Sequence, residues 1–288
     1  MGNKHNDEER TLNRPSNINL PFFAYGIFKP GQLAHSKIRN HIMDIKNDEI
    51  NYPMKHRDGV PILIDKESSH SQTQGCIITF RKGQEKETYD IIRKTLLNKL
   101  YEWKTIKING KDCNVVFGVN PENGSDYIED PDERVNFDGK NDPLFSDAIE
   151  LIEENLKSNK FSWHMESFFQ LQMNYMLLWS AIDRFSRLKY NRPTKGINNK
   201  KFANEKAFKE GIKRYATNQH IPVYSTEDLK MHNFNADNPE DTIFYYYTVR
   251  CNIVHNGKGM PGDYNMLKTA TEELLEIFKE ILKNSFKI

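Results

Sequence analysis

The sequence predicts an α+β protein in which a small mixed β-barrel precedes an all-α helical bundle. In residues 20–120, short runs of β-branched and aromatic residues are broken by Gly, Pro and Asp, which is typical of strands joined by turns. After residue 143, apolar residues instead recur at helical spacing. The 288 residues are enough for two domains, each with its own core.

The first half is expected to form one compact domain over residues 20–120, after a polar, flexible N-terminus at residues 1–19. One helix is predicted over Glu87–Leu100. Strands are predicted in LPFFAYGIF, which begins at Leu20, and in Gly59–Ile64, Gly75–Phe80, Trp103–Ile108 and Cys113–Val119.

The second half follows an acidic linker predicted at residues 121–143, which are rich in Pro, Gly, Asn and acids. Residues 144–288 are expected to form a bundle of about five helices. The predicted helices are Leu144–Leu156, Phe161–Tyr190, Asn204–Tyr215, Asp241–His255 and Tyr264–Phe286. An apolar stripe along the long second helix comprises Phe168, Leu171, Tyr175, Leu178, Ile182 and Phe185.

Charge is unevenly distributed, although the whole chain carries only +1. Residues 122–154 hold twelve acids and two bases, whereas residues 183–214 hold eleven bases and three acids. Only the basic stretch would attract a polyanion such as RNA, and an ordinary solvated helix face is the alternative. The RNA-binding residues predicted there are Arg184, Arg187, Lys200 and Lys201.

The cysteines favour a reducing cytoplasm. Cys76, Cys113 and Cys251 lie far apart without CxxC spacing, so neither a zinc site nor a disulfide framework is expected. The sequence shows neither a signal-peptide pattern nor about 18 continuous apolar residues, so no membrane span is expected. No metal or cofactor is predicted.

A candidate catalytic pair lies in the segment TVRCNIVHNGKG, which contains Arg250 and His255. Metal-independent RNA cleavage needs a cation on the phosphate and groups that transfer protons, and arginine and histidine serve these roles. Residues five apart lie about 140° apart around a helix, but the helix-stop signal Asn256-Gly257 puts His255 in the last turn. Alternatively, both cations only complement the helix dipole.

This segment resembles the motif of the HEPN family (higher eukaryotes and prokaryotes nucleotide-binding domains), Arg-x4–6-His on a late helix. The resemblance covers residues 144–288 and implies RNA cleavage across a homodimer. Arg250 would hold the phosphate, His255 would transfer a proton, Asn252 would orient them, and Lys258 would contact the RNA backbone. The preceding helix LLWSAIDRFSRL would supply Asp183. Cys251 stands where nucleolytic members often have a polar residue, and some members only bind nucleotides, which leaves a non-catalytic module as an alternative.

A second candidate site lies at FFAYGIFKPGQ, Phe22–Gln32, where an apolar strand enters a turn at Gly26. Such a glycine allows backbone N–H groups to receive an anion, although a plain tight turn would show the same residues. The segment resembles the opening of the γ-glutamylcyclotransferase-like family, over residues 20–119. The resemblance implies a cavity lined by Tyr25, Gly26, Ile27 and Phe28, for a small anionic ligand or a partner protein.

The glutamate that this family uses for proton transfer is not found. Aligning TYDIIRKT with the family pattern LDxxEG keeps Asp90 but places Arg93 at the acid, and arginine stays protonated at neutral pH. The leading hypothesis is therefore a ribonuclease with an inactive cyclotransferase-like regulatory domain. By analogy, the combination favours a toxin or phage-defence effector. A cyclotransferase that releases 5-oxoproline is the rival enzyme.

Overall fold

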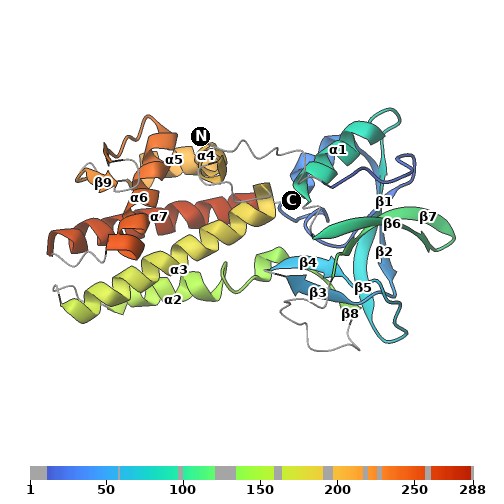
Figure 1. Cartoon of the computed structure of the whole chain (residues 1–288), viewed down its shortest axis with the longest axis horizontal. Helices are drawn as coiled ribbons and strands as arrows, with labels where there is room; N and C mark the ends of the chain where they lie inside the picture. Colours follow the sequence, from blue (N-terminus) through green and yellow to red (C-terminus); the bar gives the residue numbers. More distant parts are fainter. Residues whose placement is uncertain are drawn as a thin grey trace. The chain divides into compact units, whose positions relative to one another are not determined.

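The computed structural model describes residues 12–57, 59–96, 100–120, 134–158, 164–190, 197–216, 220–225, 229–256 and 261–286. The chain divides into two compact units (Figure 1). The first contains residues 1–140 and 188–191, and the second contains 141–187 and 192–287. The main division falls between Lys140 and Asn141, inside the range predicted as a linker.

The first unit is built on a mixed sheet. Its strands are β1 (Phe22–Ala24), β2 (Ile42–Ile50), β5 (Gln72–Phe80), β6 (Tyr101–Ile108), β7 (Lys111–Gly118) and β8 (Arg134–Val135). Their order is β2-β5-β1-β7-β6, with β8 beside β5. The pairs β1–β7 and β5–β8 are parallel, and the others are antiparallel.

Smaller elements complete this unit. They are the hairpin β3 (Met54–Arg57) and β4 (Val60–Leu63), helix α1 (Glu85–Thr95), and the 3-10 turns η2 (His35–Lys37), η3 (Arg39–His41) and η4 (Gly139–Asn141).

The predicted β-barrel is wrong, because the described strands form an open sheet with β2 and β6 at its two ends. Strand β2 was absent from the prediction, and its residues Met43–Lys46 are exposed to solvent. A strand that pairs on one side only and buries few side chains lacks the apolar run that marks a central strand. The coarser prediction of a mixed α+β protein is confirmed.

Two segments expected to lie outside the first domain pack against it. Leu12 is buried, and the carbonyl of Asn13 accepts a 2.6 Å hydrogen bond from Trp103 Nε1, although residues 12–19 were predicted to be flexible. Phe137, predicted in the linker, is also buried, and β8 pairs with β5 just before it.

The second unit contains six described helices, so every predicted helix has a counterpart. They are α2 (Asp147–Ser158), α3 (Met165–Tyr190), α4 (Ile197–Ala203), α5 (Lys206–Tyr215), α6 (Pro239–Asn256) and α7 (Pro261–Ser285). The unit is not all-α, however, because β9 (Val223–Ser225) and β10 (Lys230–His232) form an antiparallel hairpin. Strands of three residues are too short to show a period of two in the sequence.

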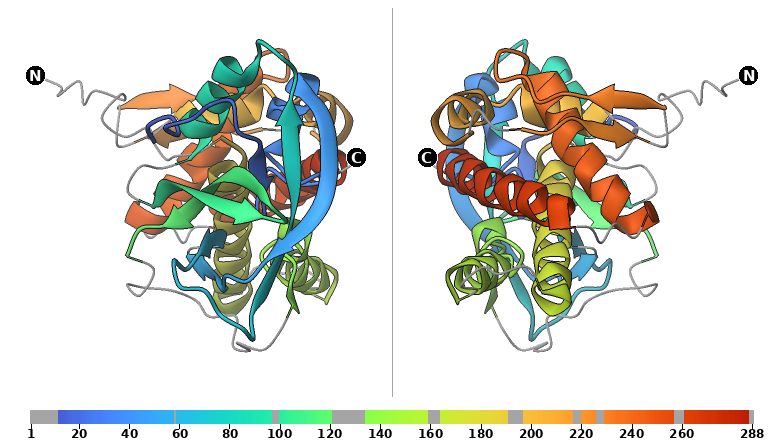
Figure 2. Two further views of the ribbon diagram at one scale, coloured as in Figure 1. Left: turned by 90° about the vertical axis from the view of Figure 1, so that its right-hand side faces the viewer. Right: turned by 90° about the vertical axis from the view of Figure 1, so that its left-hand side faces the viewer.

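The core of this unit lies between α3, α6 and α7. The six stripe residues predicted on α3 are all buried. The Tyr175 hydroxyl donates a 2.8 Å hydrogen bond to the carbonyl of Tyr246, which joins α3 to α6. Phe185 of α3 packs edge-on against Phe278 of α7, where the two longest helices cross (Figure 2). Among the described helices, none combines the length and apolarity that crossing a membrane requires.

Candidate functional site

Arg250 lies on α6, facing aromatic side chains. It is half-buried, and its guanidinium carbon lies 5.8 Å from the ring centre of Tyr247. Tyr247 in turn packs edge-on against Trp179 of α3, with ring centres 5.7 Å apart. The Nε atom of Arg250 is buried and has no hydrogen-bond partner among the described residues. The described residues therefore leave this donor without an acceptor.

Asp183 lies one turn beyond Trp179 on α3 and is coupled electrostatically to Arg250. The surrounding protein raises the pKa of Asp183, while the positive charges of Arg250 and Arg187 oppose this shift. Asp183 is nevertheless exposed to solvent, so the neighbouring protein shields its carboxyl group only in part. The structure thus brings together the arginine and the acid that the sequence had paired, with Arg187 beside them.

Asn252 makes its described hydrogen bond away from this cluster. Its side chain is buried, and Nδ2 donates a 2.9 Å hydrogen bond to the carbonyl of Tyr224 in β9. This bond ties α6 to the hairpin that the sequence analysis missed. The predicted role of orienting the catalytic pair stays a prediction.

The other half of the predicted pair is less fully described. Helix α6 continues to Asn256, so the backbone of His255 is helical and in the last turn, as expected. The side chain of His255 lies outside the described part of the chain, and so does Lys258. The geometry between Arg250 and His255 stays a prediction.

The predicted RNA-binding residues differ in their surroundings. Arg184 forms a 2.8 Å ion pair with Asp142, which engages its guanidinium inside the unit. Lys200 lies 3.3 Å from Glu240 but remains more than half exposed. Lys201 is exposed and has no ion-pair partner among the described residues.

In the first unit, Tyr25, Gly26, Ile27 and Phe28 line a cavity of about 20 Å³. That is space for about one water molecule. The Tyr25 hydroxyl donates a 3.0 Å hydrogen bond to the carbonyl of Val116, and a Cβ atom added at Gly26 would lie 2.6 Å from Pro61 Cγ. The predicted pocket residues do lie together, but neighbouring side chains fill most of the space between them.

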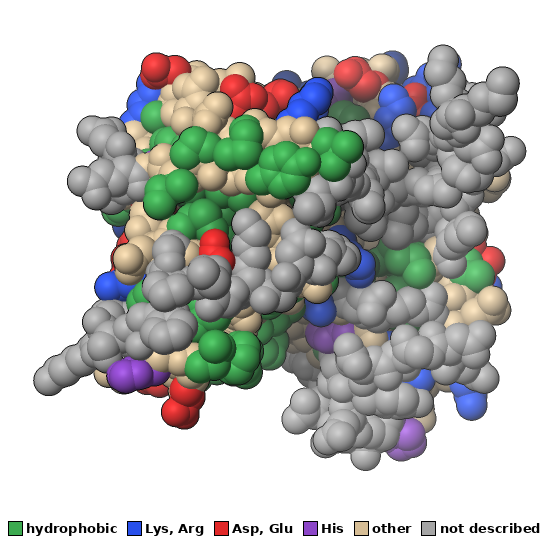
Figure 3. All heavy atoms as spheres, turned by 60° about the vertical axis from the view of Figure 1, so that its left-hand side comes forward, with side chains coloured by type: hydrophobic (Ala, Val, Ile, Leu, Met, Phe, Trp, Pro, Cys, Tyr) green, Lys and Arg blue, Asp and Glu red, His purple; other side chains and the backbone are tan. Residues whose placement is uncertain are grey.

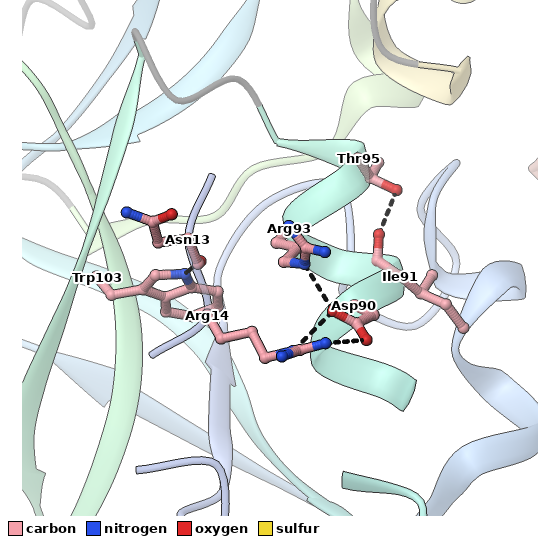
Figure 4. A network of polar contacts seen from close by, with 7 residues as sticks. All are labelled: Asn13, Arg14, Asp90, Ile91, Arg93, Thr95 and Trp103. Atoms are coloured by element: carbon pink, nitrogen blue, oxygen red, sulfur yellow. Dashed lines mark hydrogen bonds and ion pairs between the residues drawn. The ribbon is translucent and has the colours of Figure 1, made fainter. Parts of the chain in front are cut away.

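Asp90, in the segment that the sequence analysis compared with LDxxEG, lies in a network with two arginines (Figure 4). Arg93 Nε donates a 2.6 Å hydrogen bond to Asp90, and Arg14 donates two more at 2.6 and 2.7 Å. The hydrogen bonds from Arg14 and, to a lesser extent, from Arg93 lower the pKa of Asp90 to about 2. None of the described residues that line the small cavity is acidic.

A larger polar cavity of about 720 Å³ lies elsewhere in the first unit and was not predicted. Its wall includes Lys29, Gln32 and the acids Asp48, Glu49 and Asp138. Lys29 Nζ donates to Asn136 Oδ1 and, over 3.0 Å, to the carbonyl of Phe137. Burial lowers the pKa of Lys29, and the charges of Cys76 and Asp138 oppose this only in part. The whole wall of the cavity comes from four separate segments of the chain, so no local motif signals it.

Comparisons of the chain with models of protein families, with curated proteins and with solved structures gave no match. The two family resemblances seen in the sequence therefore enter only as proposals.

Proposed function

We propose that this protein is a metal-independent endoribonuclease that acts in the cytoplasm through a HEPN-like second unit. The cyclotransferase-like first unit would bind a ligand or regulate cleavage without cyclotransferase activity, as suits a toxin or phage-defence effector. The observation that carries the proposal is the half-buried Arg250 beside Asp183, with an Nε donor that has no described partner. A buried donor without a partner costs about 1–3 kcal/mol, and an anion bound there would recover that cost.

The chemistry uses few groups. The 2′-oxygen of a ribose attacks the adjacent phosphorus, a P–O2′ bond forms, and the P–O5′ bond breaks. Arg250 donates hydrogen bonds to the phosphate oxygens as negative charge grows on them. Asp183 contributes a negative charge near the guanidinium, and His255 takes or gives a proton. The products are a 2′,3′-cyclic phosphate and a free 5′-hydroxyl.

The proposal includes a homodimer, because each chain supplies a single motif histidine and the reaction needs both an acid and a base. Hydrophobic side chains gather on the face shown in Figure 3. Exposed apolar residues of the second unit include Val254, on the motif helix, and Tyr224 and Met231, on the hairpin that contacts this helix. Exposed apolar groups beside a motif are typical of an interaction surface.

The test is cleavage of single-stranded RNA in excess EDTA. We expect cleavage that survives the chelator, yields 2′,3′-cyclic phosphate ends, and falls at least about 100-fold in His255→Ala. His70→Ala, which removes an exposed histidine of the first unit, is the matched control and should cleave like the parent. Cleavage that stops in EDTA, or that persists in His255→Ala, would refute the proposal.

A further inference from the structure

Helix α5 carries a lysine stripe, defined here as Lys206, Lys209 and Lys213. Residues at these spacings lie within about 60° of one another around a helix, so they share one face. All three side chains are exposed, and Lys206 is 88% exposed. The opposite face buries Phe208 and Ile212 in the unit. Packing therefore holds the stripe outward along the length of the helix.

The charge of the stripe is largely uncompensated. Lys206 lies 3.7 Å from Glu210, but Lys209 and Lys213 have no ion-pair partner among the described residues. By comparison, Lys157, Lys268 and Lys279 of α2 and α7 each lie within ion-pair distance of a glutamate. Among the described residues, the stripe therefore presents two unpaired positive charges on one exposed helix face.

The basic surface continues onto α4. Phe202 of α4 packs against Phe208 of α5 with ring centres 5.4 Å apart, and against Phe185 of α3 at 6.0 Å. Helix α4 therefore contacts both α5 and α3, the helix that carries Asp183, and α4 and α5 are neighbours in Figure 1. Lys200 and Lys201 on α4 are exposed. Cations thus extend from α5 over α4 towards the proposed site.

We propose that the lysine stripe binds the sugar-phosphate backbone of the RNA at a distance from the phosphate that reacts. This inference rests on the proposed function for the identity of the ligand. Lysine is a flexible point charge that contacts phosphates without reading bases, so the stripe would contribute affinity without sequence preference. Its binding would weaken as salt is added, because each neutralised phosphate releases counterions.

The experiment measures the affinity for a labelled, unstructured RNA by fluorescence anisotropy between about 50 and about 200 mM salt. The parent is His255→Ala, which keeps the RNA intact. Adding Lys209→Gln and Lys213→Gln should make the plot of log affinity against log salt shallower by about 1.4, since each single-strand contact contributes about 0.7. Lys82→Gln with Lys86→Gln removes the same charge from exposed positions of the first unit and should leave the slope unchanged.

Each outcome decides the inference. An unchanged slope in the stripe variant overturns it, and so does an equal fall in the control. A stripe variant that loses only binding to vesicles of phosphatidylglycerol also overturns it, because the face would then belong to a membrane surface. If the unmodified protein does not cleave RNA but the slope changes as expected, the proposed ribonuclease fails while the RNA-binding face stands.

Discussion

The turn at Tyr25–Phe28 and Arg250 on helix α6 differ in whether their polar groups have hydrogen-bond partners. At the turn, the Tyr25 hydroxyl is bonded to a backbone carbonyl, and the neighbouring cavity measures about 20 Å³. At Arg250, aromatic packing holds the side chain, yet the Nε donor has no described partner and an acid lies nearby.

This difference shows that a motif in the sequence does not by itself make a binding site in the structure. Both segments were singled out in the sequence by resemblance, but in the first the Tyr25 hydroxyl is bonded within its own unit. The second keeps hydrogen-bonding capacity that folding does not use. A buried group without a partner is costly, and a bound anion at Arg250 would recover that cost.

The largest expected effect belongs to Arg250. Replacing it with alanine should slow RNA cleavage about 10²–10³-fold, because a preorganised donor to the developing charge is lost. Arg250→Lys keeps the charge without the planar fork, so its cleavage rate should lie between those of the unmodified protein and of Arg250→Ala. The measurement is single-turnover cleavage in EDTA, with the thermal midpoint as the check on folding. Full activity in a folded Arg250→Ala protein would break the contrast between the two sites.

A smaller effect is expected at Gly26, where we predict that alanine destabilises the first unit by about 1–3 kcal/mol. The added Cβ would lie 2.6 Å from Pro61 Cγ, and no shift of a flexible side-chain end can relieve that contact. Urea unfolding would measure the change in the free energy of unfolding.

The control for this prediction is a double-mutant cycle with Pro61→Ala, which removes the atom that the new methyl group meets. The cost of Gly26→Ala should fall by about 1 kcal/mol in that background. A cost below about 0.5 kcal/mol in both backgrounds would show that the turn has room after all, and the first site would become the better candidate for a ligand.

The sequence predicted the helices of the second unit because their apolar residues repeat over many turns, as the buried stripe on α3 shows. It did not predict β2, whose exposed polar residues carry no apolar period, or the short hairpin β9–β10. The pairing of Arg250 with Asp183 followed from a motif whose two parts sit on long helices. The Asn252 contact could not be predicted, because its acceptor is a backbone carbonyl of the missed hairpin.

The smallest expected effect concerns Arg14, which tests whether Asp90 and its two arginines now serve only stability. The pKa of Asp90 in the folded protein is about 2, below its ordinary value of 3.8. A depressed carboxyl pKa stabilises the fold above the ordinary value, and this stability is lost as the pH falls from about 4 to about 2. Because the pair is exposed to solvent, Arg14→Gln should lower the free energy of unfolding only slightly near neutral pH.

The cost of Arg14→Gln should shrink as the pH falls from about 4 through about 2, because Asp90 becomes protonated in both proteins only below its folded pKa. Urea unfolding at several pH values measures this cost. The control is Lys86→Gln, which removes an exposed charge from α1, the helix that carries Asp90. A cost that stays constant with pH would mean that Arg14 acts by packing rather than through Asp90. A variant that gained 5-oxoproline release would show instead that these arginines restrain a working acid, and the first unit would be an enzyme.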